Sequence, residues 1–523
     1  MRSRLLLLFI SFTSILALVG CSRQAPLPVN PRLALVAFDN QSSSEDQWIS
    51  SLIGLAGLYQ LGNEHALAVN LATDAEGWRT LGVGRTITGN YRREPKGIRV
   101  HASLTNTATT ELLGDFDELI AEAELLKGSE RILGQLLGVK PAPLGSTPAA
   151  WAAFAKLSQS SASLSEFLRA HADFAPAYPV FAGFLLREGK RDEAVALKNA
   201  IPANADAFSK AQLNLVVAAD SKSRLDALRV LTQLRSGDPR MLAELATIAS
   251  GQGDWALAAE QYRALTRLEP SKVDWWNSLG YAESNQNHLP ASVAALNEYR
   301  RLAPQEANPI DSLGEVHYQN RQFAAAAKYF DEQSLRFPAF QNGSAWRKAS
   351  FAYFFAGDLK TADLRFEEWM KRVLSNASPT AQTFQRAMWL ARTGRIPDSR
   401  ALLAKQDPPI HLAMISFGLD GTRPQPSQLQ AWNTKITDPA LRNEFSLFAL
   451  LTQPASNLDS LKARITASIP QPQLAQLRNE MLAAAEMTMA EPKQQKPNIF
   501  PLPNVIDTPI DATLLRWRLA VIP

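Results

Sequence analysis

The sequence predicts a mainly α-helical protein, an α-solenoid of antiparallel helix pairs preceded by a small α/β domain. Three observations support this fold class. Prolines recur every 34 residues at Pro270, Pro304 and Pro338, strand-like alternation is confined to residues 32–139, and an apolar leader ends at the only cysteine. With 523 residues, of which 46% are hydrophobic and 20% charged, the chain has enough apolar material for several ordinary cores.

The first twenty residues have the composition of a secretory signal peptide. Two arginines precede an apolar run from Leu5 to Val19, and Gly20 stands directly before Cys21. A charged start, an apolar middle and small residues at the end define such a signal. The alternative is a transmembrane helix, but about 17 apolar residues are at the short limit for crossing a bilayer.

The sequence from Leu18 to Cys21, Leu-Val-Gly-Cys, resembles the lipobox of bacterial lipoproteins. The resemblance implies that residues 1–20 are removed, that Cys21 receives acyl chains, and that residues 21–31 form a tether. Two acyl chains anchor a protein stably because each buried methylene contributes about 0.8 kcal/mol. Ser22 stands where lipoproteins retained in the inner membrane have aspartate, which implies the bacterial outer membrane with the protein facing the periplasm.

Residues 32–139 alternate strand-like and helix-like segments, which predicts a small α/β domain. Apolar residues alternate with polar ones on both sides of a proline–glycine turn, and this pattern indicates a hairpin. The expected elements, in order, are a buried strand at 33–38, a helix at 47–61, a hairpin around the turn at 94–97, a strand at 111–116 and a helix that ends near Leu137.

The same segments resemble the TolB-like domain that often precedes tetratricopeptide repeats in bacterial proteins. The resemblance rests on a first strand followed by Phe38-Asp39-Asn40 and on the segments 87–93, 98–104 and 107–113. It implies an interaction module and not an enzyme.

From residue 148 to residue 417 the strand pattern gives way to helix pairs with a period, clearest over 239–374. Small residues recur where the two helices of a pair would touch, and proline ends the second helix because it cannot continue the hydrogen-bond ladder. This pattern strongly resembles the tetratricopeptide repeat (TPR). Its signature positions are Leu242, Leu245, Gly253, Ala258, Tyr262 and Pro270; Trp276, Leu279, Gly280, Leu296 and Pro304; Ile310, Leu313, Gly314, Phe323, Ala326, Phe330 and Pro338; and, after a two-residue insertion at Asn342 and Gly343, Trp346, Tyr353, Gly357, Ala362 and Phe366.

Beyond the repeats the signature fades. Helical segments over 424–491 are expected to be degenerate repeats or a cap, which a solenoid needs to cover its last apolar face. The tail over 492–523 is proline-rich and is expected to be extended.

The sequence contains no recognisable catalytic or metal-binding constellation. A single cysteine excludes internal disulfides and cysteine-based metal sites, and the six histidines are scattered singly. The glycines at Gly82, Gly84 and Gly89 lack the lysine of a phosphate loop, so we interpret them as the start of a strand. A formal charge of +4 is too small to indicate a nucleic-acid partner. We therefore predict no metal, no cofactor and no enzymatic activity.

The first helix of each TPR pair lines an inner groove, in which positions i, i+4 and i+8 of successive repeats form a stripe. We predict that this stripe binds an extended peptide, with amides bonding the main chain and two acids favouring a basic ligand. The acids argue against the TPR chaperone function, in which lysine and arginine hold a terminal carboxylate. Alternatively, the stripe is a solvated face with its phenylalanines in the core. It comprises Asn277, Tyr281, Asn285, Asp311, Glu315, Gln319, Arg347, Phe351 and Phe355.

Taken together, these patterns predict a scaffold that is anchored to the membrane through lipidated Cys21 and binds protein or peptide partners in the bacterial cell envelope. Two alternatives remain open. One is a cell-envelope hydrolase with accessory repeats, because carboxylates cannot be paired from sequence. The other is a sensor or adaptor that acts through a partner, because TolB-like domains joined to repeats also occur beside signalling modules.

Overall fold

The computed structural model describes residues 32–61, 66–69, 77–78, 82–142, 144–157, 160–235, 237–437, 439–452, 458–468 and 482. The predicted signal peptide, the tether with Cys21 and the proline-rich tail lie outside the described residues. The chain divides into two compact units, residues 1–272 and residues 273–523. None of the helices in the described part of the chain is long and apolar enough to cross a membrane.

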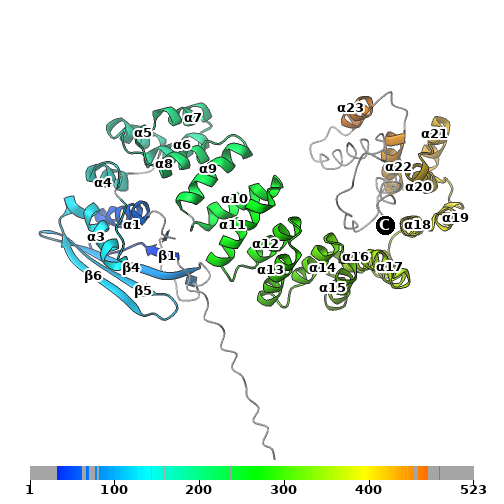
Figure 1. The fold of residues 1–523 in the computed structure, drawn as a ribbon. Coiled ribbons are helices and arrows are strands. Elements are labelled where there is room, and N and C mark those ends of the chain that lie inside the picture. Colours follow the sequence, from blue (N-terminus) through cyan, green and yellow to red (C-terminus); the bar gives the residue numbers. More distant parts are fainter. Residues whose placement is uncertain are drawn as a thin grey trace, which may run out of the picture. The chain divides into compact units, whose positions relative to one another are not determined.

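The first unit begins with a mixed sheet in the order β3-β1-β4-β5-β6, with β2 paired to β4 (Figure 1). The first strand is parallel to β3 and β4, and β5 is antiparallel to its two neighbours, β4 and β6. The hairpin predicted around residues 94–97 is present. The strands are β1 (Arg32–Val36), β2 (Asp39–Asn40), β3 (Ala66–Val69), β4 (Val83–Glu94), β5 (Gly97–Asn106) and β6 (Leu112–Ile120).

Two helices, α1 (Trp48–Leu61) and α3 (Leu125–Leu137), share one core with the sheet. Alternate residues of β5, from Ile98 to Leu104, are buried in this core, as the period of a half-covered strand requires. The α3 helix ends at Gly138, whose φ of 68° is the left-handed conformation that glycine adopts without strain.

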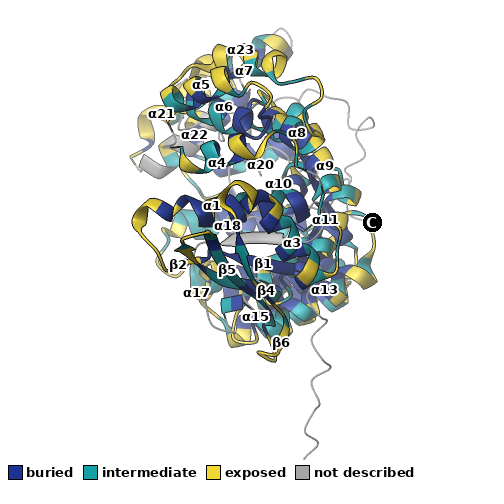
Figure 2. Cartoon of the chain, turned by 90° about the vertical axis from the view of Figure 1, so that its left-hand side faces the viewer, coloured by how far each residue is buried: buried dark blue, intermediate teal, exposed yellow. Residues whose placement is uncertain are grey.

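The rest of the first unit consists of helices, and most of them begin at a side chain that caps the first turn, such as Asp206 or Asp220. Their pairing is α6 with α7, α8 with α9 and α10 with α11. The α7 helix is mostly exposed, with only Ala194 buried (Figure 2). The helices are α4 (Pro148–Lys156), α5 (Ser161–Ala170), α6 (Ala177–Arg187), α7 (Arg191–Ala200), α8 (Ala207–Val216), α9 (Ser221–Leu234), α10 (Pro239–Gly251) and α11 (Trp255–Leu268).

The core of the sheet continues without a break into α4, α5 and α6. Trp151 and Phe154 of α4 pack with Phe167 and Phe174 in the same cluster as Ile87 of β4. Aromatic side chains bury large areas, and the packing of this set holds α4 and α5 against α1. The sequence placed the end of the α/β domain near residue 139, whereas the structure has one core across that position.

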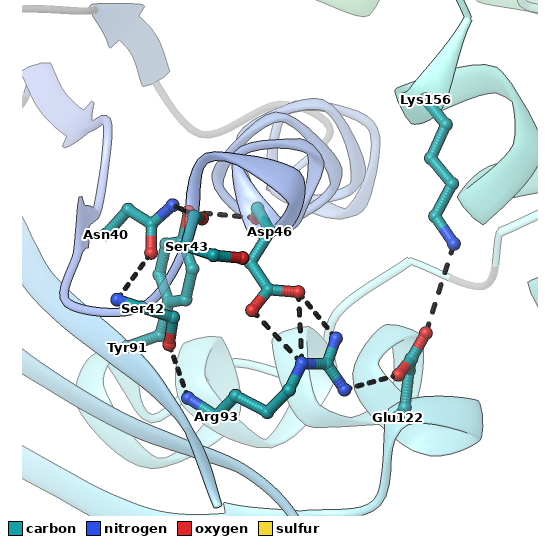
Figure 3. A network of polar contacts seen from close by, with 8 residues as sticks. All are labelled: Asn40, Ser42, Ser43, Asp46, Tyr91, Arg93, Glu122 and Lys156. Atoms are coloured by element: carbon teal, nitrogen blue, oxygen red, sulfur yellow. Dashed lines mark hydrogen bonds and ion pairs between the residues drawn. The ribbon is translucent and has the colours of Figure 1, made fainter.

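Charged side chains also join the sheet to α4 (Figure 3). Arg93 of β4 donates from its Nε to both carboxylate oxygens of Asp46, at 3.0 and 3.1 Å, and from Nη1 to Glu122 at 2.8 Å. Lys156 of α4 lies 3.9 Å from Glu122 and 4.0 Å from the ring centroid of Trp48. The hydrogen bonds from Arg93 lower the pKa of the buried Asp46 carboxyl below its ordinary value.

The second unit begins with four helix pairs, and in the first two of them the close approach of the helices depends on glycine. A Cβ on Gly280 would lie 2.5 Å from Leu296, and one on Gly314 would lie 2.5 Å from Phe330. Glycine at these positions lets the second helix of each pair approach the first. The paired helices are α12 (Val273–Asn285), α13 (Leu289–Leu302), α14 (Asn308–Gln319), α15 (Phe323–Arg336), α16 (Ser344–Phe355), α17 (Leu359–Val373), α18 (Pro379–Arg392) and α19 (Ile396–Leu403).

Helices α20 (Ile410–Asp420), α21 (Pro426–Lys435), α22 (Pro439–Thr452) and α23 (Leu458–Ser468) follow the four pairs. A core that contains Phe384, Met414 and Phe448 joins α18 to α20 and α22. The predicted fold class, a TPR-like α-solenoid preceded by a small α/β domain, is confirmed.

Candidate functional site

The stripe predicted on the first helices brings α12 and α14 together through side-chain hydrogen bonds. Ser312 donates to Asn277 at 2.9 Å, and Tyr281 donates to the carboxylate of Glu315. One turn further along α12, Ser284 lies 3.5 Å from the side-chain oxygen of Gln319. We call this row of contacts between α12 and α14 the polar seam, made of Asn277, Tyr281, Ser284, Ser312, Glu315 and Asn320, which donates to Ser284 at 2.8 Å. The exposed Gln319 lies at its edge.

A lysine from α16 extends the polar seam to a third helix. The ammonium of Lys348 donates to both carboxylate oxygens of Asp311, at 2.8 and 2.9 Å, and to Glu315 at 2.7 Å. Lys348 is 6% exposed and Asp311 is 2% exposed, so the contact is shielded from water. Both acids therefore bond an internal lysine, which balances one of their two negative charges. The expected preference for a basic ligand stays a prediction.

The electrostatics of these groups follow from their burial. Burial raises the pKa of Asp311 above its ordinary value, an effect that Lys348 opposes and Glu315 reinforces. Burial by itself lowers the pKa of Lys348, but the attraction of the two carboxylates outweighs burial and raises it. Burial, followed by the charge of Glu315, raises the pKa of Tyr281. Tyr281 therefore stays a hydrogen-bond donor.

Of the three stripe residues predicted on α16, two are buried in the core and the third is partly buried. Arg347 is 1% exposed, with its guanidinium 5.0 Å from the ring centroid of Trp369. Phe351 is 6% exposed and meets Trp389 edge-on at 5.3 Å. Phe355 is partly buried and lies 5.1 Å from the ring of Phe323. For α16 the structure favours the alternative interpretation, in which these side chains belong to the core of an imperfect repeat.

Two amides of the stripe remain exposed, namely Asn285 on α12 and Gln319 on α14. Asn285 donates one hydrogen bond to the carbonyl of Tyr281 at 2.9 Å, and its side-chain oxygen accepts none in the described part of the chain. Asn277, Tyr281 and Glu315 are partly exposed. The exposed side chains of the stripe are therefore these two amides. The polar side chains beside them already form hydrogen bonds with one another.

Sequence reasoning missed Lys348, which completes the buried charge cluster. A two-residue insertion precedes α16, and the backbone there has positive φ at Gln341, Asn342 and Gly343, with values of 45°, 55° and 74°. Once the insertion is counted, Lys348 of α16 is the position equivalent to Ser312 of α14, and each of the two meets the first stripe residue of the preceding first helix, Asp311 and Asn277 respectively. The usable signal was chemical, because two acids one turn apart in a buried helix require a cation nearby.

Within the described ranges, no group of three or more histidine, cysteine, aspartate or glutamate side chains is placed to hold a metal ion. The buried acids of α14 have a lysine between them, so their oxygens are engaged by an ammonium. The chemistry that this arrangement offers is hydrogen bonding from the exposed amides.

No protein-family model and no curated protein matches the chain. Solved structures that resemble part of it include a crystal structure of the MamA protein, with 18% identity, a TM-score of 0.27, and coverage of 29% of this chain and 82% of that one. A second crystal structure of MamA has 18% identity, a TM-score of 0.28, and coverage of 33% and 98%. An identity of 18% and TM-scores of 0.27 and 0.28 carry no argument about function. The repeat assignment therefore rests on the helix pairs and glycine contacts described above.

Proposed function

We propose that this chain is a scaffold of the bacterial cell envelope, anchored in the outer membrane through lipidated Cys21 and facing the periplasm, which binds protein or peptide partners on its TPR-like helices. The observation that carries the binding proposal is the pair of exposed amides, Asn285 and Gln319, beside the polar seam. Amide side chains donate to and accept from a peptide main chain, so they recognise an extended segment of many sequences. No catalytic role forms part of the proposal.

The polar seam supports this proposal because it fixes the surface that carries the amides. Tyr281 and Glu315 join two helices, and Lys348 joins the third. A surface whose polar groups are held in place loses less conformational entropy when a partner binds. The buried cluster therefore serves as a rigid support, and the exposed amides make the contact.

The anchor rests on sequence alone, on the position of the only cysteine after an apolar leader. Metabolic labelling of cells with a palmitate analogue tests it directly. We expect label on the wild-type chain and none on a Cys21→Ala variant. Equal labelling of both chains would refute the anchor, and fractionation of outer and inner membranes then tests the location.

Binding is tested by pull-down from solubilised envelopes with the full chain. The variant carries Asn285→Ala and Gln319→Ala, and the matched control carries Asn297→Ala and Gln305→Ala, two exposed amides outside the stripe. We expect the first pair to reduce enrichment of a partner about tenfold, since two lost hydrogen bonds are worth roughly 1–3 kcal/mol. Equal enrichment by both variants would show that the stripe does not bind.

A further inference from the structure

Two adjoining cavities lie beside α1 in the first unit. One has a volume of about 470 Å³ and the other about 380 Å³. They share part of their lining, and the smaller one continues along the first helices α6, α8 and α10. Volumes of this size, at the contact between a domain and its neighbouring helices, are typical of small-molecule sites. The shared lining is Tyr59, Trp151, Pro176, Phe208 and Arg235.

The smaller cavity is an apolar chamber. Its walls include Leu55 of α1, Val180 of α6, Leu215 of α8 and Met241 of α10. Aromatic rings stand where the two cavities meet, with Tyr59 edge-on to Trp151 at 5.5 Å and to Phe208 at 5.6 Å. Such walls suit the body of an apolar ligand.

A positive charge stands at the junction of the cavities. The guanidinium of Arg235 lies 3.6 Å from the ring centroid of Phe208 and donates to the carbonyl of Leu58 at 2.7 Å. None of the ion pairs among the described residues involves Arg235. Burial lowers the pKa of Arg235, and the charges of Tyr59, Asp238 and Asp206, none of which forms an ion pair with it in the described part of the chain, oppose that shift. Such a charge attracts an anion.

The larger cavity also limits how much negative charge a ligand can carry. Asp173 and Asp206 are part of its lining, and both are exposed. Asp173 accepts a hydrogen bond from Ser146 at 3.1 Å, and Asp206 caps α8 by accepting from the amide of Ser209 at 2.8 Å. Two exposed carboxylates in the lining repel a doubly charged group more strongly than a singly charged one, and so a phosphate monoester fits less well than a monoanion.

We propose that these cavities bind a small monocarboxylate with an apolar body, whose carboxylate pairs with Arg235 and whose body fills the chamber between α1 and the helices α6, α8 and α10. A carboxylate matches the planar donor pattern of a guanidinium. Ligand binding there joins the α/β domain to the first repeats. This function is separate from the proposed peptide binding on the second unit.

The test is equilibrium dialysis of the full chain in phospholipid nanodiscs against radiolabelled octanoate and 3-phenylpropanoate, with empty nanodiscs as the blank. We expect saturable binding of at least one monocarboxylate. Arg235→Gln should weaken it about tenfold or more, because a hydrogen-bonded charge pair is lost. Octanamide, which has no charge, should bind weakly to the wild type and equally to the variant.

Two further variants keep the test decisive if Arg235→Gln unfolds. Met241→Trp fills the chamber and leaves Arg235 in place, and it should abolish octanoate binding. Arg229→Gln removes an exposed arginine of α9, the helix that ends directly before Arg235. Arg229 pairs with Asp254 at 3.3 Å, and its loss should leave binding unchanged. Circular dichroism checks the fold of each variant. Absence of saturable binding for both carboxylates, or equal binding by wild type and Met241→Trp, overturns the proposal.

Discussion

The first helices of the two units have the same place in the repeat and different surroundings. In the first unit, helices α6, α8 and α10 contribute apolar side chains such as Val180 and Met241 to cavities beside α1. In the second unit, helices α12 and α14 contribute the polar seam and are joined to α16 through Lys348. The comparison teaches that a repeat period determines how helices pair, whereas the residues between the signature positions determine what the first-helix face contacts.

The largest expected effect comes from removing the buried cation of the second unit. Lys348→Met leaves Asp311 and Glu315 without their partner, and we expect the unfolding free energy to fall by about 3–5 kcal/mol. Urea unfolding of the full chain followed by circular dichroism measures it, and the loss should appear in one transition if the two units unfold separately.

Two controls separate the loss of charge pairing from the loss of a side chain. Lys328→Met removes an exposed lysine of α15 and should change stability by less than about 0.5 kcal/mol. Adding Asp311→Asn and Glu315→Gln to Lys348→Met neutralises the whole cluster and should recover most of the loss. If Lys348→Met matched Lys328→Met, the buried charge cluster would have no role in stability.

The next effect concerns the pH dependence of stability, whose expected direction differs between one aspartate in each unit. The pKa of Asp46 in the first unit is lowered by Arg93, whereas the pKa of Asp311 in the second is raised by burial. Stability rises with pH wherever the unfolded state binds more protons. The contribution of Asp46 is therefore present above its unfolded pKa of about 4 and is lost as pH falls through its folded value. The contribution of Asp311 is present at low pH and is lost as pH rises through its folded value.

Denaturant unfolding at pH 7 and pH 4 checks these signs. Asp46→Asn should cost about 1.5–3 kcal/mol at pH 7, because a charge-assisted bond is lost, and should flatten the acid-induced loss of stability. Asp311→Asn removes a group that gains protons on acidification in the folded state, so the acid-induced loss should become steeper. An exposed aspartate on α19, changed in Asp398→Asn, is the control. Two aspartate variants that responded in the same direction would contradict the comparison.

The sequence predicted what depends on local pattern and spacing. Gly280 and Gly314 marked the close approach of paired helices, and the structure confirms that side chains fill the space above them. The hairpin of β4 and β5 followed from alternation and its turn. The missed features are long-range. Periodicity assigns a residue to a face of its own helix, but it does not show that Lys348 of α16 reaches Asp311 of α14. Nor does it show that aromatic side chains distant in sequence join α4 to α1.

Substitution of one glycine in each unit tests how tightly the helices of that unit pack. Gly314→Val in α14 places side-chain carbons against Phe330, so we expect a loss of about 1–3 kcal/mol from overpacking. Gly183→Ala in α6 meets nothing within 4 Å and should gain up to about 1 kcal/mol from helix propensity. Thermal melting of both variants gives the comparison. A stabilising Gly314→Val would mean that α14 and α15 are farther apart than the structure shows.

The smallest expected effect on stability distinguishes the polar seam of the second unit from the exposed amides Asn285 and Gln319. Asn285→Ala and Gln319→Ala remove side chains that are exposed, so each should change the unfolding free energy by less than about 0.5 kcal/mol. Ser312→Ala, in contrast, removes a buried donor to Asn277 and should cost about 1–2 kcal/mol. Urea unfolding of the three single variants makes the comparison. If the exposed amides cost as much as Ser312, they belong to the support, and a partner would have no accessible amide surface to use on α12 and α14.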